Sequence, residues 1–147
     1  IKMKINFKKL NERAVAPTYG SAGSAGGDLY GAEENDVVIP AGETAFIGTG
    51  IAVEIPLGYV GLVYARSGLA CKRGLAPANK VGVIDSDYRG EIKVALHNHG
   101  KTDQIVAKGE RIAQLVIAPY LFAEYEEKDE LSDTVRGEGG FGSTGRK

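Results

Sequence analysis

Apolar and polar residues alternate at four places along the chain, the pattern of β-strands with one buried face. The longest stretch covers residues 45–55, where every second position is filled by Ala45, Ile47, Thr49, Ile51, Val53 and Ile55. Residues 1–7, 60–64 and 92–96 show the same alternation over shorter stretches. We therefore expect a strand at each of these places.

Turn signals separate the alternating stretches at regular intervals. They are Pro-Ala-Gly at 40–42, Pro-Leu-Gly at 56–58, Asn-His-Gly at 98–100 and Lys-Gly at 108–109. Such spacing is typical of an all-β barrel or sandwich. Only Ser67–Arg73 predicts a helix, with Ser67 as its cap and Gly74 as its stop. Residues 20–27, which read GSAGSAGG, predict a loop.

Composition makes this an ordinary globular protein and narrows its partners. A chain of 147 residues and 15.5 kDa most simply forms one domain, and the net charge of −1 gives no electrostatic reason to bind nucleic acid. No stretch approaches about 18 apolar residues, and the N-terminus lacks the apolar core of a signal peptide, so we expect no membrane partner. The single cysteine, Cys71, indicates a reducing compartment.

The chain ends in a glycine-rich segment, residues 136–145, with the sequence RGEGGFGSTG. It contains G-x-G-x-x-G, but no strand-to-helix context supports a dinucleotide site, and Ser143 stands where a Walker-type loop needs lysine. One reading is a frayed terminus. The other is a lid, in which Arg136 and the Ser143 and Thr144 hydroxyls bind phosphate while Phe141 stacks on a base.

Three internal segments could form the site that such a lid would close. Residues 64–70 pass from a predicted strand into the predicted helix and present Arg66, Ser67 and backbone N–H groups suited to an anion. Residues 25–30 place Asp28 after the glycine loop, where a carboxylate suits an outer-shell contact with the water of Mg²⁺.

Residues 82–91 place two carboxylates and a tyrosine at a turn, in a pattern close to a β-hairpin. A carboxylate in a turn most often bonds its own backbone, and Asp87 fits that role. Asp85 directly follows the apolar residues 81–84, so a strand end could hold it rigidly. Such a carboxylate can accept a proton from an attacking water.

Five segments together resemble, in order, the five motifs of the trimeric dUTP diphosphatase (dUTPase) family. They are AGGDLY at 25–30, RSGLA at 66–70, GVIDSDYRGE at 82–91, GERIAQL at 109–115 and RGEGGFGSTG at 136–145. Five ordered motifs at compatible spacing are far more specific than any one of them. The resemblance covers the chain from about residue 28 to residue 145.

The resemblance implies a jelly-roll-like all-β fold with one short helix, assembled as a homotrimer whose active sites draw motifs from all three chains. It implies hydrolysis of dUTP to dUMP and pyrophosphate with Mg²⁺ carried mainly by the substrate phosphates, which keeps uracil out of DNA and supplies dUMP for thymidylate synthesis. We expect a β domain at residues 1–135, a flexible C-terminal lid arm at 136–147, and a location in the cytoplasm, or also the nucleus of a eukaryote.

The resemblance also implies a role for individual residues. In the chemistry, Asp85 resembles the general base, Gln114 the polar residue near the phosphates and the catalytic water, and Asp28 the carboxylate linked to the metal's waters. The implied substrate-binding residues are Arg66, Ser67 and Gly68 at the phosphates, Asn79, Val81, Gly82, Val83 and Ile84 at uracil, Tyr88 at deoxyribose, and Arg136, Phe141, Gly142, Ser143 and Thr144 in the lid.

Two departures and two alternatives accompany this interpretation. Ala65 stands where the second motif commonly has proline, and Gly27 stands where the first motif often has a larger side chain. The related dCTP deaminase branch would release ammonia, but the third and fifth motifs match the diphosphatase pattern. A catalytically silent nucleotide-binding module would not need a positioned base such as Asp85.

Overall fold

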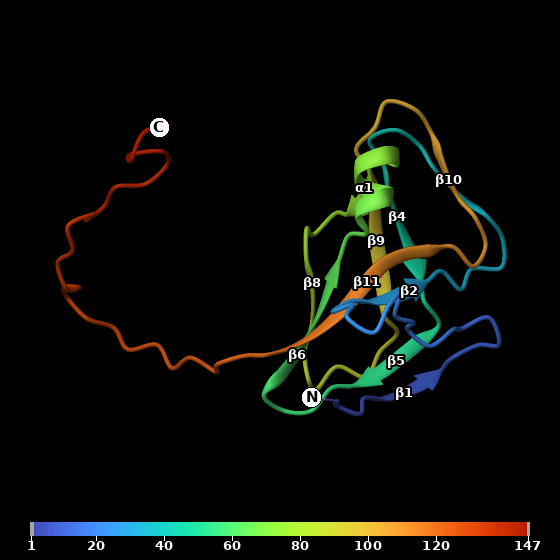
Figure 1. Cartoon of the computed structure of the whole chain (residues 1–147), viewed down its shortest axis with the longest axis horizontal. Coiled ribbons are helices and arrows are strands. Elements are labelled where there is room, and N and C mark those ends of the chain that lie inside the picture. The colour runs from blue at the N-terminus through green and yellow to red at the C-terminus, as the bar shows by residue number, and fades with distance from the viewer. Residues whose placement is uncertain (1, 147) are drawn as a thin grey trace.

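Short antiparallel strands dominate the computed structural model, which describes residues 2–146 (Figure 1). The elements are β1 (Asn6–Lys9), β2 (Gly27–Tyr30), β3 (Val37–Ile39), β4 (Thr44–Gly48), β5 (Ile51–Glu54), β6 (Tyr59–Tyr64), α1 (Ser67–Arg73), β7 (Leu75–Pro77), β8 (Gly82–Ile84), β9 (Lys93–Asn98), β10 (Gln104–Val106) and β11 (Arg111–Pro119). The all-β prediction with one short helix is confirmed.

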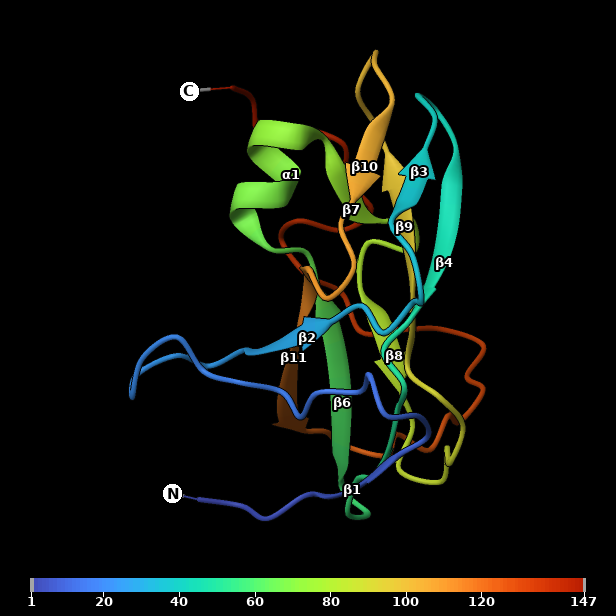
Figure 2. The ribbon, with the colours of Figure 1, turned by 90° about the vertical axis from the view of Figure 1, so that its right-hand side faces the viewer.

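Two larger sheets and two strand pairs make up the body. One sheet has the order β2-β11-β6-β8 and the other β4-β9-β7, while β1 pairs with β5 and β10 with β3. All pairings are antiparallel. Figure 2 shows α1 outside the strands, where the chain passes from β6 to β7.

The core lies between these sheets and is aliphatic. Its most deeply buried side chains are Leu29, Ile39, Ile47, Ile51, Ile55, Leu75, Leu96, Ile112 and Val94. The expected inward face of residues 92–96 is confirmed, since Ile92, Val94 and Leu96 are all buried. In β6 the buried positions are Gly61 and Val63. The alternating residues from which this strand was predicted, Val60, Leu62 and Tyr64, therefore lie on its other, less buried face.

The strands differ from the prediction in the first half of the chain. Residues 45–55 form β4 and β5 rather than one strand, because Gly50 has φ +67° and a side chain there would meet Asn11 at 2.8 Å. The alternation at 1–7 is also a poor guide, since β1 begins only at Asn6 and its four residues are all exposed. Ile1 lies outside the described residues.

The helix occupies the predicted residues, but its cap differs. The N-cap residue is Arg66, with extended backbone and no side-chain hydrogen bond to the helix, so the expectation of Ser67 as cap was wrong. Ser67 is instead the first helical residue. Gly74 adopts the left-handed conformation that ends the helix, as predicted.

The hairpin-like interpretation of residues 82–91 was wrong. The strand before the turn, β8, pairs with β6, whereas the next strand, β9, pairs with β4 and β7. The connection therefore crosses from one sheet to the other, and residues 85–92 are too long for the two-residue turn of a tight hairpin.

Candidate active site

Two predicted residues, Asp28 and Arg66, meet Arg111 at the junction of β2, β11 and α1. Asp28 accepts from Arg66 Nε through Oδ1 at 3.1 Å and from an Arg111 terminal nitrogen through Oδ2 at 3.2 Å. The Asp28 side chain is only 15% exposed, so this carboxylate holds two arginines in a partly dry environment. Each arginine keeps further N–H donors that a phosphate could use.

Gln114 joins the same junction through the register of β11. It is paired with Asp28 of β2 on one side and with Tyr64 of β6 on the other. Its Nε2 donates to the Ala65 carbonyl oxygen at 2.8 Å, which ties the segment before α1 to β11. A Cβ at Gly26 would lie 2.2 Å from Gln114 Oε1, so glycine is needed there.

Small residues in the first motif make room for a neighbouring segment. A Cβ at Gly27 would approach Pro17 Cβ at 3.1 Å and the Tyr19 ring at 3.6 Å. The larger side chain expected at this position is therefore replaced by Pro17 and Tyr19, which occupy the space. Ser67 and Gly68 follow at the exposed start of α1, beside Arg66.

A second group of predicted residues surrounds an indentation of about 120 Å³ beside β8. Asn79, Gly82, Val83 and Ile84 all line it, together with residues of β6, β7 and β9. Glycine at position 82 leaves space for Asn79, whose Nδ2 would lie 3.4 Å from an added Cβ. Val81 lies in the adjoining turn, where its N–H bonds the Asn79 carbonyl at 2.7 Å.

The turn that carries Asp85, the candidate general base, follows this indentation and is held by hydrogen bonds within residues 85–91. The Tyr88 N–H donates to the Asp85 carbonyl at 3.1 Å, and Tyr88 Oη donates to the Glu91 carbonyl at 2.9 Å. A Cβ at Gly90 would lie 2.6 Å from the ring carbon Cζ of Tyr88, so glycine lets the ring fold over the turn. Asp85 itself is exposed.

Asp85 and Arg66 lie far apart within one chain. Ile84 is opposite Gly61 in the β8–β6 ladder, and Arg66 follows Gly61 by five residues (66 − 61). At about 3.3 Å per strand residue, the steps from Gly61 to Tyr64, the last residue of β6, span roughly 10 Å, and Arg66 lies beyond that end of the strand. Groups that act on one phosphorus must lie within hydrogen-bond reach or one water of it. One chain therefore does not bring its own Asp85 close to its own residues 66–68, which are predicted to bind phosphate and are called the phosphate turn below.

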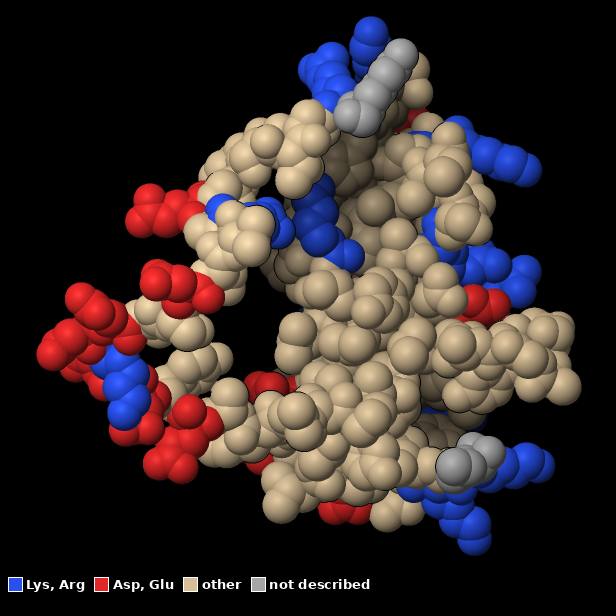
Figure 3. All heavy atoms as spheres, turned by 60° about the vertical axis from the view of Figure 1, so that its left-hand side comes forward, with Lys and Arg blue, Asp and Glu red and all other residues tan. Residues whose placement is uncertain are grey.

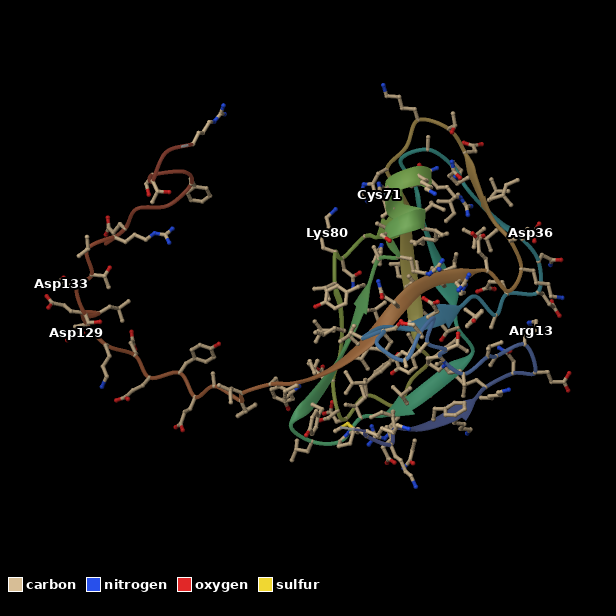
Figure 4. The ribbon with its side chains drawn as sticks, viewed as in Figure 1. Arg13, Asp36, Cys71, Lys80, Asp129 and Asp133 are labelled. Carbon is tan, nitrogen blue, oxygen red and sulfur yellow. The ribbon has the colours of Figure 1, made fainter. Side chains whose placement is uncertain are left out.

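The C-terminal arm lies apart from the body in a wide curve (Figures 1 and 4). Beyond Tyr120, which bonds the Gly58 carbonyl, its hydrogen bonds reach no farther than three residues along the chain. Phe141 is fully exposed and Arg136 Nε donates to the Gly139 carbonyl at 2.7 Å. The predicted boundary between residues 135 and 136 stays a prediction, while the last strand ends at Pro119.

Charge is distributed unevenly between arm and body. The arm carries Glu124, Glu126, Glu127, Asp129, Glu130 and Asp133, and Figure 3 shows its acidic side chains gathered away from the body. Lys80, on the turn before β8, points outward from the body in Figure 4. The pKa of His99 is lowered, first by partial desolvation of its otherwise exposed ring and then by the nearby charges of His97 and Lys80.

Within residues 2–146 no group of three or more His, Cys, Asp or Glu side chains could hold a metal ion. Asp28 nevertheless suits a contact to metal-bound water, because each of its oxygens has a second lone pair beyond the one given to arginine.

Among these described residues, no helix is long and apolar enough to span a membrane.

Sequence reasoning missed three charged residues that surround the phosphate turn. Arg111 belongs to the fourth motif, where only Gln114 received a role, and Arg73 forms an ion pair with Glu110. The signal available was the Glu-Arg pair at 110–111, which spans the start of β11, a strand that enters the site.

Comparison with known proteins decides the family. A family model described as dUTPase matches residues 12–145. The chain belongs to the dUTPase family. The "Deoxyuridine 5'-triphosphate nucleotidohydrolase" of Nautilia profundicola is 54% identical over 98% of this chain and 100% of its own, and that of Hydrogenobaculum sp. is 50% identical over 99% and 100%.

Solved dUTPase structures share the fold along the whole chain. The dUTPase of Staphylococcus bacteriophage 80alpha, solved with dUPNHPP, superposes with a TM-score of 0.89 at 33% identity, covering 98% of this chain and 99% of its own. The dUTPase of phage phi11 of S. aureus, a mutant described with a structural Mg(II) ion, has a TM-score of 0.80 at 29% identity over 87% and 98%.

Proposed function

We infer that this dUTPase-family chain hydrolyses dUTP to dUMP and pyrophosphate, which keeps uracil out of DNA and supplies dUMP for thymidylate synthesis. The observation that carries this is the position of Asp85 at the end of β8, directly after the indentation lined by Asn79, Gly82 and Val83. A base-binding site is thereby adjacent to a carboxylate that can accept a proton. The relatives named for deoxyuridine triphosphate support the same substrate.

Discrimination comes from the indentation and its adjoining turn. Backbone groups of residues 81–84 and the Asn79 side-chain amide read the edge of uracil, and the changed donor and acceptor pattern of cytosine would leave these polar groups unpaired. The Tyr88 ring, folded over Gly90, packs beneath the deoxyribose and excludes a 2′-hydroxyl.

The chemistry is an in-line displacement at the α-phosphorus. Asp85 takes a proton from the attacking water, Gln114 orients groups near the phosphates, and pyrophosphate leaves. Arg66, with the Ser67 and Gly68 backbone, neutralises charge on the phosphate oxygens, and the Mg²⁺ that dUTPases use supplies further neutralisation when bound. Asp28 holds Arg66 in place and, when the metal is bound, would contact its water. No covalent nucleophile is required.

We propose a homotrimer whose active sites are shared between subunits. The separation of Asp85 from Arg66 in one chain supports this, because the two must come from different copies to act on one nucleotide. The exposed arm supports it too, since Leu121, Phe122, Tyr125, Leu131 and Val135 are at least 88% exposed in the single chain. Such apolar side chains are expected to be covered by a partner.

The last part of the arm acts as the lid on this shared site. Arg136 binds the terminal phosphate, Phe141 stacks on uracil, and the Ser143 and Thr144 hydroxyls with the Gly142 backbone contact phosphates. Gly142 has φ +87° and Gly137 has φ +54°, so glycine permits the tight turns that bring these groups together. Closure over nucleotide excludes bulk solvent and encloses the attacking water beside the α-phosphorus.

An end-point assay tests the proposed reaction. Purified protein with Mg²⁺ is incubated separately with dUTP, dCTP, dTTP and UTP, and monophosphate, pyrophosphate and ammonia are measured. We expect pyrophosphate and dUMP from dUTP alone. Ammonia from dCTP would assign the chain to the deaminase branch, and binding without any product would indicate a silent nucleotide-binding module.

We also propose that the enzyme works in the cytoplasm, or also in the nucleus if the source is a eukaryote. Cys71 is exposed and is the only cysteine, so a reducing compartment keeps it as a free thiol. Cell fractionation with an antibody to the protein tests this location, and recovery from an oxidising compartment would contradict it.

A further inference from the structure

The phosphate turn is carried by a helix too short to fix its own orientation. Helix α1 has seven residues and a single buried side chain, Leu69. Isolated helices shorter than about 12 residues are marginal in water, so α1 depends on contacts with the rest of the body. Since Ser67 and Gly68 form its first turn, whatever holds α1 also places the phosphate-binding groups.

The C-terminal end of α1 is anchored by Arg73. Its Nε donates to Gln104 Oε1 at 3.1 Å, and its two terminal nitrogens donate to the Glu110 carboxylate and the Ile105 carbonyl oxygen. The ion pair is partly buried, with 30% of the Arg73 side chain and 21% of the Glu110 side chain exposed. One guanidinium therefore connects α1 to β10 and to the residue before β11.

Glu110 is itself held in place from several directions. Its second carboxylate oxygen accepts from the Ala107 N–H at 2.8 Å, and its carbonyl accepts from the Gly31 N–H at 2.9 Å. Both partners are backbone groups, so the carboxylate has little freedom to follow a moving helix. Glu110 is thus a fixed point to which Arg73 attaches.

The two ends of α1 are connected through one dipeptide. Arg66, directly before α1, is held by Asp28, and Asp28 also binds Arg111. Arg111 follows Glu110, which holds Arg73 at the other end of the helix. These contacts form a closed ring that starts and ends on α1. It includes Arg66 at one end of the helix, Arg73 at the other, and Arg111 between Asp28 and Glu110.

We propose that Arg73 and Glu110 are positioning residues for triphosphate binding. They set the orientation of α1, and through it the placement of Ser67, Gly68 and Arg66, without touching the nucleotide. The ring also supplies the constraint that proline would give at position 65, where this chain has alanine. This inference rests on the proposed assignment of residues 66–68 to the phosphates.

The first test is Glu110→Gln, which keeps the side-chain shape and removes the ion pair. Affinity for a non-hydrolysable dUTP analogue and for dUMP is measured by calorimetry, with kcat and KM for dUTP and a check of oligomeric state and unfolding midpoint. A misplacement of about 1 Å can cost on the order of 10²-fold. We expect about a tenfold loss of affinity for the triphosphate analogue and a change below about twofold for dUMP.

The matched control is Glu34→Gln, which removes the same charge from an exposed pair with Arg13, 3.8 Å away. We expect both affinities to stay unchanged in this variant. An equal loss of triphosphate and dUMP affinity in Glu110→Gln would show a general disturbance and overturn the proposal. Unchanged affinity for both ligands would overturn it as well.

A double-mutant cycle separates a shared clamp from two independent effects. Arg73→Gln alone should lose as much triphosphate affinity as Glu110→Gln, and the double variant should lose no more than either. Losses that multiply would contradict a joint role of Arg73 and Glu110.

Arg66→Ala separates this inference from the proposed function on which it rests. If Arg66→Ala loses triphosphate affinity while Glu110→Gln does not, only this inference fails. If Arg66→Ala also keeps that affinity, the assignment of residues 66–68 fails.

Discussion

At the scale of single residues, hydrogen bonds and close packing fix the orientation of several side chains in the candidate site. Asp28 holds Arg66 and Arg111, Gln114 bonds the Ala65 carbonyl, and the Tyr88 ring folds over Gly90. The functional groups are thus oriented before substrate arrives, which reduces the reorganisation required during the reaction.

Asp85→Asn should separate binding from chemistry. The amide has nearly the same shape but cannot accept the proton of the attacking water, so kcat should fall by about 10²-fold or more. Affinity for a non-hydrolysable dUTP analogue should change little, because the indentation beside β8 is intact. A variant with full turnover would show that another group is the base.

Gly26→Ala should impair catalysis with little effect on folding. The added Cβ would lie 2.2 Å from Gln114 Oε1 and 3.1 Å from Gln114 Cβ, so the amide must leave its present position while β11 shifts by only a few tenths of an ångström. We expect kcat to fall by about tenfold. The control is Gly23→Ala, where an added Cβ meets nothing within 4 Å. Equal rates for the two variants would contradict the role of the Gln114 position.

At the scale of elements, the sequence predicts what depends on local pattern and misses what depends on distant neighbours. The helix Ser67–Arg73 and its Gly74 stop follow from local chemistry and are confirmed. The break at Gly50 arises because the chain must pass close to Asn11 and Ala14, which alternation cannot reveal.

The same distinction applies to the candidate site. Motif residues such as Asp28 and Gln114 could be selected from the sequence, but their pairing across β2 and β11 is a matter of register. Arg73 and Glu110 stand 37 positions apart, and no local pattern connects them. The crossing of residues 85–92 between sheets likewise depends on the partner strands, which the turn residues do not specify.

The buried side chain of Asn98 stabilises the end of β9 through three hydrogen bonds. Its Nδ2 donates to the Ile39 and Thr102 carbonyl oxygens at 2.9 and 2.8 Å, and its Oδ1 accepts from the Gly100 N–H. Asn98→Ala leaves buried backbone groups unpaired and should lower the free energy of unfolding by about 2–3 kcal/mol. Urea denaturation checks this, with exposed Asn35→Ala as control; matching midpoints would refute the claim.

At the scale of the whole molecule, a single chain is incomplete. Its arm exposes large apolar side chains, and its Asp85 and Arg66 lie beyond opposite ends of the β6–β8 ladder. The proposed assembly of three copies would resolve both features, because it would cover the arm and supply the missing part of each site. The glycine-rich end is then a lid for a site on another subunit.

Removal of residues 137–147 should leave the body and its assembly intact. Of these, residues 137–146, which the structure describes, form hydrogen bonds only within the arm, so size-exclusion chromatography and the unfolding midpoint should match the full chain. Turnover of dUTP should fall by about 10²-fold or more, because the site loses the phosphate contacts of the lid and the bound triphosphate is less well positioned. An unaffected rate would show that the end of the arm is merely frayed.

Subunit mixing tests the shared site most directly. Asp85→Asn chains and chains lacking residues 137–147 are unfolded, mixed in equal amounts and reassembled, and dUTP hydrolysis is compared with that of each variant alone. If Asp85 and the lid of one site come from different subunits, about a quarter of the sites regain both intact parts, and activity rises to about a quarter of the wild-type value. If one chain supplied both parts, no intact site would form, and activity would stay at the level of the separate variants.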